Sequence, residues 1–214
     1  MNEDDTRALM VELGASLFAR GFSVGSAGNI SVRLTDGYLI TPTNSSLGRL
    51  DPARLSRLDA EFAHQSGDPP SKEVFMHRAF YRARADAGAV VHLHSTMATA
   101  RACLADPGEP PIPPLTPYFV MRVGRTLPVV PYYRPGDAAM EPAITEAARM
   151  ARAMLLANHG PVVCGATLTD AVYAAEELEE AAKLAVLLQG ATTRMLTGIQ
   201  VEDLLATFTP PRPG

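Results

Sequence analysis

Three histidines in this chain could bind one metal ion. His92 and His94 lie two positions apart at the end of the apolar run 89–93, which is typical of a buried strand, so both side chains should leave the same face of a sheet. His159 follows a second apolar run and precedes a Gly-Pro pair, which predicts a tight turn. Three nitrogen ligands with an open fourth position are the pattern of a catalytic zinc site. Each histidine alone could equally be an inert polar residue, so the hypothesis depends on all three together.

Glu73 could add a carboxylate to this site. It lies in the segment Ser71-Lys72-Glu73, where Ser71 is the predicted N-cap of a helix that runs to about Arg84. If the fold brings Glu73 to the metal, it could be a displaceable ligand and a proton carrier. At a helix start, a carboxylate can also simply compensate the helix dipole. The N–H groups of the same helix end, together with Lys72, would attract a phosphate.

Two loops have the composition of an anion-binding site. Residues 26–31 (SAGNIS) and 41–46 (TPTNSS) are rich in hydroxyl, amide and small side chains, and they offer backbone N–H groups. The same residue types dominate ordinary turns, so each loop alone is a weak indication.

The other histidines and the two cysteines carry less information. His64 lies in a polar loop and is expected to be solvated. His77 lies four residues after Glu73 on the same helix face, where it could support the site, although a position at the surface or the core edge is the more common one. Cys103 and Cys164 form no CxxC pair and are expected to be buried thiols in a reducing compartment.

Length and composition exclude several classes of function. The chain has 214 residues, 47% of them hydrophobic, which predicts one domain over residues 1–214 with a flexible tail at 210–214. A net charge of -4 without a basic stripe argues against a nucleic-acid partner. No apolar run approaches the roughly 18 residues of a membrane span. The acidic first ten residues do not resemble a secretory signal, so we expect a cytoplasmic location and no membrane partner.

Helical and strand patterns alternate irregularly along the chain, which favours a mixed or antiparallel sheet. The longest predicted helix has Thr167 and Asp170 as a capping box and ends at Gly190. The proline-rich segment 106–136 should hold no long regular element. The predicted helices cover 4–20, 71–84, 96–104, 137–152 and 169–189, and the predicted strands cover 30–34, 38–41, 55–58, 89–93, 154–156 and 162–164.

Taken together, these motifs resemble the class II aldolase/adducin family. The resemblance covers about residues 5–190, and its specificity lies in the order and separation of the motifs. It implies a three-layer α/β/α fold with a central mixed, largely antiparallel sheet, and homotetramers with active sites at subunit interfaces. The motifs that carry it are GNIS at 28–31, TPTNSS at 41–46, SKE at 71–73, HLH at 92–94 and NHG at 158–160.

The resemblance also assigns roles to single residues. It implies one Zn²⁺ per subunit held by His92, His94 and His159, with Glu73 as the acid/base residue and as a ligand when no substrate is bound. Mn²⁺ or Co²⁺ could replace zinc in such a site. Asn44 stands where the family usually has glycine, and asparagine tolerates a positive φ better than most residues. The phosphate-pocket positions are Gly28, Asn29, Thr43, Asn44, Ser71 and Lys72.

Three further segments, 115–125, 130–137 and 173–179, resemble the branch of the family that contains 3-oxo-tetronate 4-phosphate decarboxylases. This branch implies a phosphorylated sugar-acid substrate, of D or L configuration, that loses CO2 through a metal-stabilised enediolate to give dihydroxyacetone phosphate. Arg122, Arg125 and Arg134 are candidates for holding the departing carboxylate. Tyr118 is a candidate proton donor and could come from a neighbouring subunit.

Two other functions stay open at this point. Aldol cleavage of fuculose or rhamnulose 1-phosphate passes through the same kind of enediolate, and the family also contains 4-epimerases, so the metal motifs do not separate these reactions. A non-catalytic, adducin-like scaffold is the alternative from a different class. Such a module would be expected to lose its metal ligands, whereas this chain keeps all three histidines and Glu73.

Overall fold

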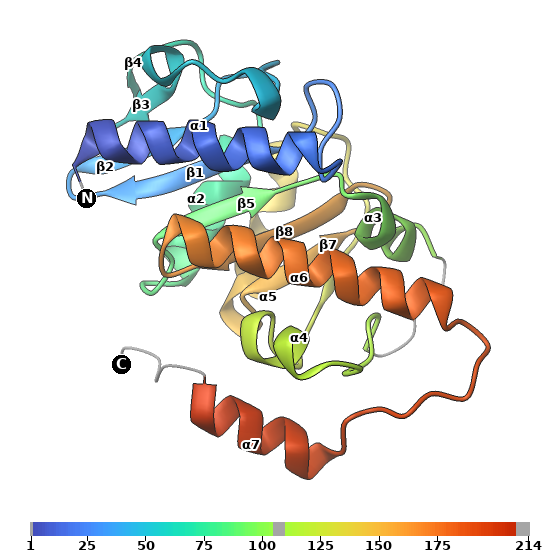
Figure 1. Cartoon of the computed structure of the whole chain (residues 1–214). Coiled ribbons are helices and arrows are strands. Elements are labelled where there is room, and N and C mark those ends of the chain that lie inside the picture. Colours follow the sequence, from blue (N-terminus) through green and yellow to red (C-terminus); the bar gives the residue numbers. More distant parts are fainter. Residues whose placement is uncertain (1, 105–109, 209–214) are drawn as a thin grey trace.

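A β-sheet separates two layers of helices in the computed structural model, which describes residues 2–104 and 110–208 (Figure 1). Within these residues the sheet has eight strands in the order β4-β3-β2-β1-β5-β8-β7-β6. Neighbouring strands are antiparallel except for the parallel pair β6–β7. The strands are β1 Asn29–Leu34, β2 Gly37–Ile40, β3 Ser56–Leu58, β4 His64–Ser66, β5 Ala89–His92, β6 Val129–Val130, β7 Ala153–Leu156 and β8 Gly160–Gly165.

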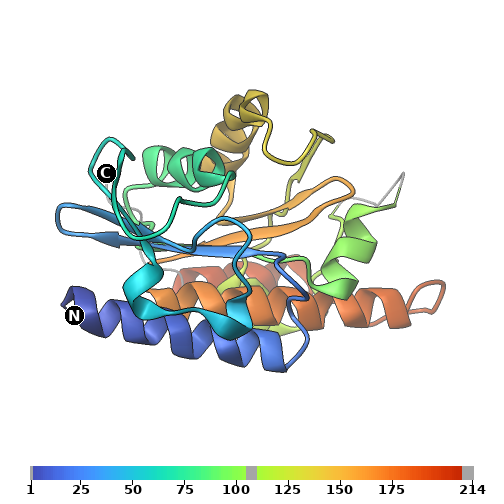
Figure 2. The ribbon, with the colours of Figure 1, turned by 90° about the horizontal axis from the view of Figure 1, so that it is seen from above.

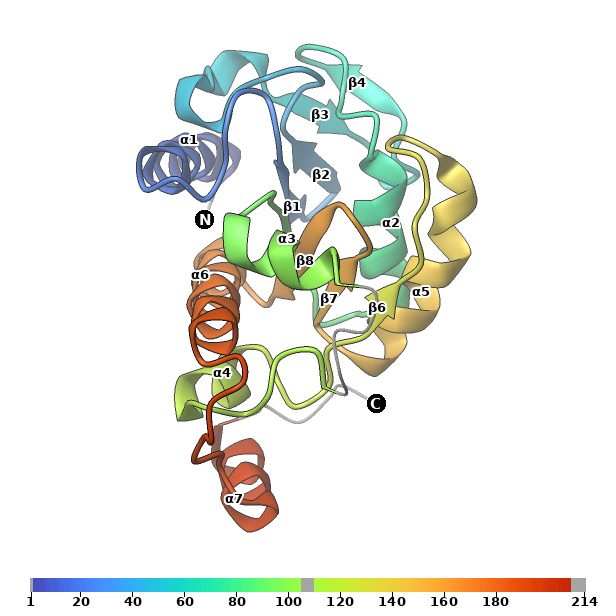
Figure 3. The same cartoon turned by 90° about the vertical axis from the view of Figure 1, so that its right-hand side faces the viewer.

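Helices cover both faces of this sheet. Two of them, α2 and α5, lie on one face, while α1, α4 and α6 lie on the other, with α7 packed outside α4 (Figures 2 and 3). The three-layer arrangement and the mixed, largely antiparallel sheet confirm the predicted fold class. The helices are α1 Glu3–Ala19, α2 Val74–Ala83, α3 Thr96–Ala102, α4 Pro117–Arg122, α5 Glu141–Met150, α6 Leu168–Leu187 and α7 Gly198–Phe208, with short 3-10 turns at Leu47–Arg49, Pro52–Arg54 and Ala138–Met140.

Strand β7 and the first three residues of β5 are apolar at every position because each face of the sheet meets its own core. In β5, Ala89 and Val91 pack into the core under α1, α4 and α6, whereas Val90 packs into the core under α2 and α5. The same alternation occurs in β7, where Leu155 and Met154 belong to different cores. A continuous hydrophobic run in this sequence therefore marks a strand that is buried on both faces.

The long helix α6 begins as predicted. The hydroxyl of Thr167 accepts a hydrogen bond from the backbone N–H of Asp170 at 3.1 Å, which satisfies one of the donors that a helix start leaves unpaired. The helix ends at Leu187, and Gly190 follows with a φ of 80°, a conformation that glycine adopts without strain.

The predicted start of α2 was wrong by three residues. Ser71 does not cap the helix, which begins at Val74 with Glu73 in the N-cap position. The reason is tertiary: the backbone N–H of Ser71 donates to the carbonyl of Thr41 at 3.2 Å, which holds residues 71–73 against the loop that follows β2. These three residues therefore form a turn beside the loops rather than the first turn of the helix.

Other expectations also need correction. Cys103 is exposed, whereas Cys164 is buried as predicted. His64 lies in the short edge strand β4, and its side chain is exposed as predicted. The helix α7 was not predicted, and the predicted tail at 210–214 lies outside the described residues. None of the helices in the described part of the chain has the length and apolarity that crossing a lipid bilayer requires.

Candidate metal centre

Antiparallel pairing brings the key residues to one end of the sheet. Asn29, the first residue of β1, pairs with His92, the last residue of β5. On the other side of β5, His92 pairs with Val162 of β8, so the turn between β7 and β8, which carries His159, lies at the same end. His94 follows β5 by two residues. Residues from three distant parts of the sequence therefore meet at this end.

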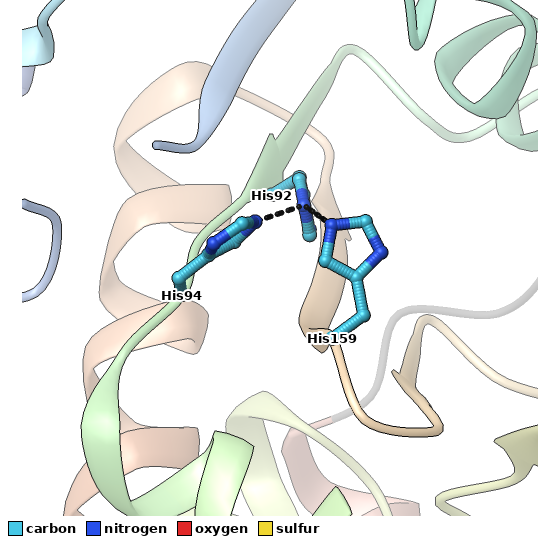
Figure 4. Close-up of side chains that lie close together, drawn as sticks. All are labelled: His92, His94 and His159. Carbon is cyan, nitrogen blue, oxygen red and sulfur yellow. Dashed lines mark hydrogen bonds between the residues drawn. The ribbon is translucent and has the colours of Figure 1, made fainter. Parts of the chain in front are cut away.

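The three histidine rings converge on one point (Figure 4). The Nε2 atom of His92 lies 3.1 Å from Nε2 of His94 and 3.3 Å from Nε2 of His159. Two ligands of a tetrahedral zinc ion with bonds of 2.0–2.1 Å are separated by roughly 3.3 Å. Among the described residues, these three histidines form a group whose ligand atoms all lie within 4.8 Å of one another.

Burial and hydrogen bonding hold His92 in the form that binds metals. Its side chain is fully buried, and its Nδ1–H donates to the carbonyl oxygen of Pro161 at 2.9 Å. The proton on Nδ1 leaves the lone pair of Nε2 directed at the other two rings. Burial, followed by the neighbouring His159, lowers the pKa of both His92 and His94. Neutral imidazoles with converging lone pairs are the donor set that a divalent cation needs.

The carboxylate of Glu73 faces the same point. Its Oε1 atom lies 3.5 Å from Nε2 of His159, and its Oε2 atom lies 3.6 Å from Nε2 of His92. The side-chain amide of Asn29 donates a hydrogen bond to Oε2 at 2.8 Å. The structure therefore brings Glu73 to the histidine group, although the helix that was expected to present it starts one residue later.

A pocket of about 610 Å³ opens beside the histidines. All six residues that were predicted to bind phosphate line it, together with Glu73, His94 and His159. Among the described residues that line it, Lys72 is the one whose side chain is a permanent cation. Seven further lining residues were not predicted as site residues, although most of them lie in or beside segments that carry the family resemblance. These seven are Ser26, Ala27, Pro42, Thr99, Pro135, Gly136 and Asn158.

Two positions in the loops have special backbone requirements. Gly28 has a φ of 79°, and a Cβ atom there would lie 2.9 Å from the carbonyl oxygen of His92. Only glycine lets this loop approach the end of β5 so closely. Asn44 has a φ of 55°, as its replacement of the usual glycine suggested. Asparagine is tolerated in this left-handed region, so the loop keeps its shape without glycine.

The predicted proton donor and the three arginines are not among the residues that line the site pocket. Tyr118 is 60% exposed on α4 and lines a different pocket, together with Arg122 and Cys164. The guanidinium of Arg122 lies over the ring of Tyr173, 5.1 Å from its centroid, and Arg125 forms an ion pair with Glu202. Arg134 is exposed and is not among the residues that line the site pocket.

Comparison with known proteins gives a consistent result. Residues 8–186 match the model of the class II aldolase and adducin N-terminal domain. A 3-oxo-tetronate 4-phosphate decarboxylase from Haemophilus influenzae is 52% identical over 92% of this chain and 95% of its own length. An L-fuculose phosphate aldolase from Escherichia coli is 36% identical over 77% of this chain and 74% of its own. The crystal structure of YgbL from Klebsiella pneumoniae superposes with a TM-score of 0.91 at 49% identity, covering 95% and 99% of the two chains.

Proposed function

The chain belongs to the class II aldolase and adducin family, and we propose that it is a metal-dependent carbon–carbon lyase that decarboxylates a 3-oxo-tetronate 4-phosphate. The products are dihydroxyacetone phosphate and CO2. One observation carries the proposal: the ring nitrogens of His92, His94 and His159 and the carboxylate of Glu73 converge beside a polar pocket large enough for a phosphorylated sugar acid. The identity to the decarboxylase relative supports the choice of reaction.

The loops on the far side of the pocket are suited to the phosphate group. Gly28 offers a backbone N–H group, Asn29 an amide, Thr43 and Ser71 hydroxyls, and Lys72 adds a positive charge. Asn44 continues this surface in its left-handed conformation. Binding the phosphate here would place the other end of a four-carbon substrate next to the histidines.

The three histidines would hold a divalent cation, and Zn²⁺ is the ion that we propose because three imidazole nitrogens suit it well. When bound, such an ion supplies a Lewis acid that stabilises negative charge on substrate oxygens. Glu73 would be a further ligand in the absence of substrate and would be displaced when substrate binds. This dual role is consistent with its distances of 3.5 and 3.6 Å from two of the histidines.

The chemistry that remains for the protein is a single proton transfer. When the bond between C1 and C2 breaks, the carboxylate leaves as CO2, and the electron pair stays on C2, conjugated with the C3 carbonyl. A proton from the Glu73 carboxyl group then bonds to C2, which gives dihydroxyacetone phosphate, and Glu73 regains a proton from water. The side chain is only 14% exposed, so its position within the pocket is restricted.

The proposal extends to the assembly. We propose a homotetramer in which Tyr118, exposed on α4, reaches the pocket of a neighbouring subunit. The cytoplasmic location predicted from the sequence is also part of this proposal. Aldol cleavage of a sugar 1-phosphate is the second candidate, favoured by the 36% identity to a fuculose phosphate aldolase.

Turnover of three substrates tests the choice of reaction. Purified protein is incubated with 3-oxo-erythronate 4-phosphate, its other stereoisomer, or fuculose 1-phosphate, and dihydroxyacetone phosphate, CO2 and lactaldehyde are measured separately. We expect CO2 in stoichiometric amounts with dihydroxyacetone phosphate from one of the first two substrates. Lactaldehyde from the third, without CO2 from the others, would make the protein an aldolase.

A variant at the proposed proton carrier tests the mechanism. Glu73→Gln keeps the size of the side chain but cannot donate a carboxyl proton, so we expect kcat to fall by about 10²- to 10⁴-fold. Metal content, measured by mass spectrometry of the purified protein, should stay stoichiometric because the three histidines remain. Stoichiometric metal with unchanged kcat would remove Glu73 from the reaction. A wild-type protein without metal and without turnover would favour the scaffold alternative.

A further inference from the structure

His77 lies at the centre of a chain of buried hydrogen bonds that ends on Glu73. It was expected at the surface or at the core edge, but its side chain is fully buried on α2. Its Nε2 atom lies 2.5 Å from Oδ1 of Asn29, and its Nδ1 atom lies 2.7 Å from Oγ of Ser31. The Ser31 hydroxyl in turn lies 2.8 Å from the hydroxyl of Tyr81. The chain therefore connects Tyr81, Ser31, His77, Asn29 and Glu73.

The hydrogen bond between Asn29 and Glu73, at one end of this series, fixes the direction of every other hydrogen bond in it. The Asn29 amide nitrogen donates to Oε2 of Glu73, so its carbonyl oxygen Oδ1 faces His77. Because Oδ1 can only accept, the hydrogen of the His77 ring lies on Nε2. A neutral imidazole then has an acceptor at Nδ1, so the Ser31 hydroxyl donates to it and accepts from Tyr81.

Burial supports this single arrangement. The absence of solvent around His77 lowers its pKa to about 3, and burial raises the pKa of the Tyr81 phenol, so both groups are neutral. The Ser31 side chain is 1% exposed and Tyr81 is 5% exposed, so water cannot readily replace one of these partners. In a buried chain with one consistent direction, reversing any member would leave two donors or two acceptors facing each other.

We infer that His77 is a positioning residue, which orients the Asn29 amide and, through it, the carboxylate of Glu73. If the Asn29 amide turned over, its carbonyl oxygen would face Oε2 of Glu73 and repel it. With the amide held by His77, Oε2 keeps its hydrogen bond to Asn29, and Oε1 is the oxygen nearest His159. The inference rests on the proposed function insofar as Glu73 is the group whose orientation matters for turnover.

Variants along the chain test this role through kinetics. His77→Phe removes both ring nitrogens, and we expect kcat to fall by about 10- to 100-fold with little change in KM, as for residues that orient catalytic groups. His77→Gln keeps a donor toward Asn29 and should recover most of kcat. Ser31→Ala and Tyr81→Phe, which are farther from Glu73, should have progressively smaller effects. Ile144→Val, in the core that α5 shares with α2, is the control for lost stability and should leave kcat unchanged.

A purely structural role would lower the melting temperature of the His77 variants but leave kcat at the level of the control, and that outcome would overturn the inference. If His77→Phe does not fold, the comparison of His77→Leu with Tyr81→Phe still decides it, because positioning predicts the larger loss of kcat for the variant that no longer holds Asn29.

Nuclear magnetic resonance of the wild-type protein tests the inference without turnover. In protein labelled with ¹⁵N-histidine, the resonances of His77 are assigned by their absence from the His77→Gln spectrum. We expect a neutral ring with its hydrogen on Nε2. In the Glu73→Gln variant, this hydrogen should stay on Nε2 only if the Asn29 amide keeps its orientation. A hydrogen on Nδ1 in the wild type would contradict the inference. If the substrates of the proposed function are not turned over, that function fails, while this measurement still decides the hydrogen-bond direction.

Discussion

At the scale of single residues, the His92 ring makes a contact through each of its two nitrogen atoms. The ring of His92 donates from Nδ1 to the Pro161 carbonyl and presents Nε2 to the other histidines, so the segment 158–161 supplies a ligand and also orients a second one. The histidine pair 92/94 could be singled out from the sequence because two side chains two residues apart in an extended segment leave the same face of a sheet. The orienting carbonyl could not, because every residue carries one and only the fold selects which is used.

Asn44 gives a prediction at the same scale. Its φ of 55° is tolerated by asparagine and costs alanine roughly 1 kcal/mol or more, so Asn44→Ala should lower the free energy of unfolding by about that amount. Asn44→Gly, which has no such cost, should be close to wild type or differ by less. Denaturant titrations of both variants measure the difference. Equal losses for alanine and glycine would show that the backbone conformation is not the cause.

Individual elements depend on partners that are remote in sequence. The helix α3, which begins two residues after His94, has no side-chain cap from Ser95. Instead, the carboxylate of Glu179 on α6 accepts hydrogen bonds from the N–H groups of Met97 and Ala98, both at 2.8 Å. A cap from another helix has no local signature in the sequence, and neither does the contact of Ser71 with Thr41 at the start of α2. The capping of α6 could be predicted because Thr167 and Asp170 are only three residues apart in the sequence.

Removing the carboxylate of Glu179 should therefore affect the site as well as the fold. We expect Glu179→Ala to lower the free energy of unfolding by about 1–2 kcal/mol, the usual cost of losing an N-cap. It should also weaken metal binding, because His94 lies two residues before the start of α3. Glu180→Ala is the matched control, since Glu180 is exposed and its carboxylate lies 3.8 Å from the exposed ammonium group of Lys183. Chemical denaturation and competition with a zinc chelator measure the two effects. Equal behaviour of both variants would remove the role of the cap.

The contact between α2 and α5 should make stability depend on pH. The Arg78 guanidinium forms two hydrogen bonds to Glu141, at 2.8 and 2.6 Å, and holds the pKa of that carboxyl below its usual range. A lowered pKa in the folded state contributes stability above the ordinary carboxyl pKa, and this contribution is lost as the pH falls through the lowered value.

The difference in unfolding free energy between wild type and Glu141→Gln should then be largest near neutral pH and should vanish in acid. Urea titrations from about pH 7 to about pH 3 follow it. The control is Glu146→Gln on the same helix, where the ion pair with Arg149 is exposed on both sides and should contribute little. A difference for Glu141→Gln that does not change with pH would contradict the assignment to the ion pair.

At the scale of the whole molecule, the candidate metal site is held by the end of the sheet rather than by one helix or loop. The histidines follow two neighbouring parts of the sheet, the end of β5 and the turn between β7 and β8, so an ion held by all three would tie these strand ends together. The mixed or antiparallel sheet could be predicted from the irregular alternation of helical and strand patterns, whereas the three layers were implied by the family resemblance. The helix α7 could not be predicted: it buries Val201 but leaves Ile199 85% exposed, so its hydrophobic residues do not mark one inner face.

Removing the metal should destabilise the entire domain. A ligand that binds only the folded state adds about 4 kcal/mol when its concentration is a thousand times its Kd, so treatment with a chelator should lower the melting temperature, and added Zn²⁺ should restore it. The double variant His92→Ala/His94→Ala should melt at a temperature that responds to neither treatment. A wild-type melting temperature that is insensitive to the chelator, in protein shown to have lost its metal, would contradict this coupling.

The pairing of Asn29 with His92 across β1 and β5 has a consequence for how this enzyme could be altered. A shift of one residue between these strands would put the two side chains on opposite faces of the sheet. Libraries that aim at new substrates should therefore leave this strand pair untouched and vary the Pro135-Gly136 segment and Lys72, which line the pocket and belong to no strand.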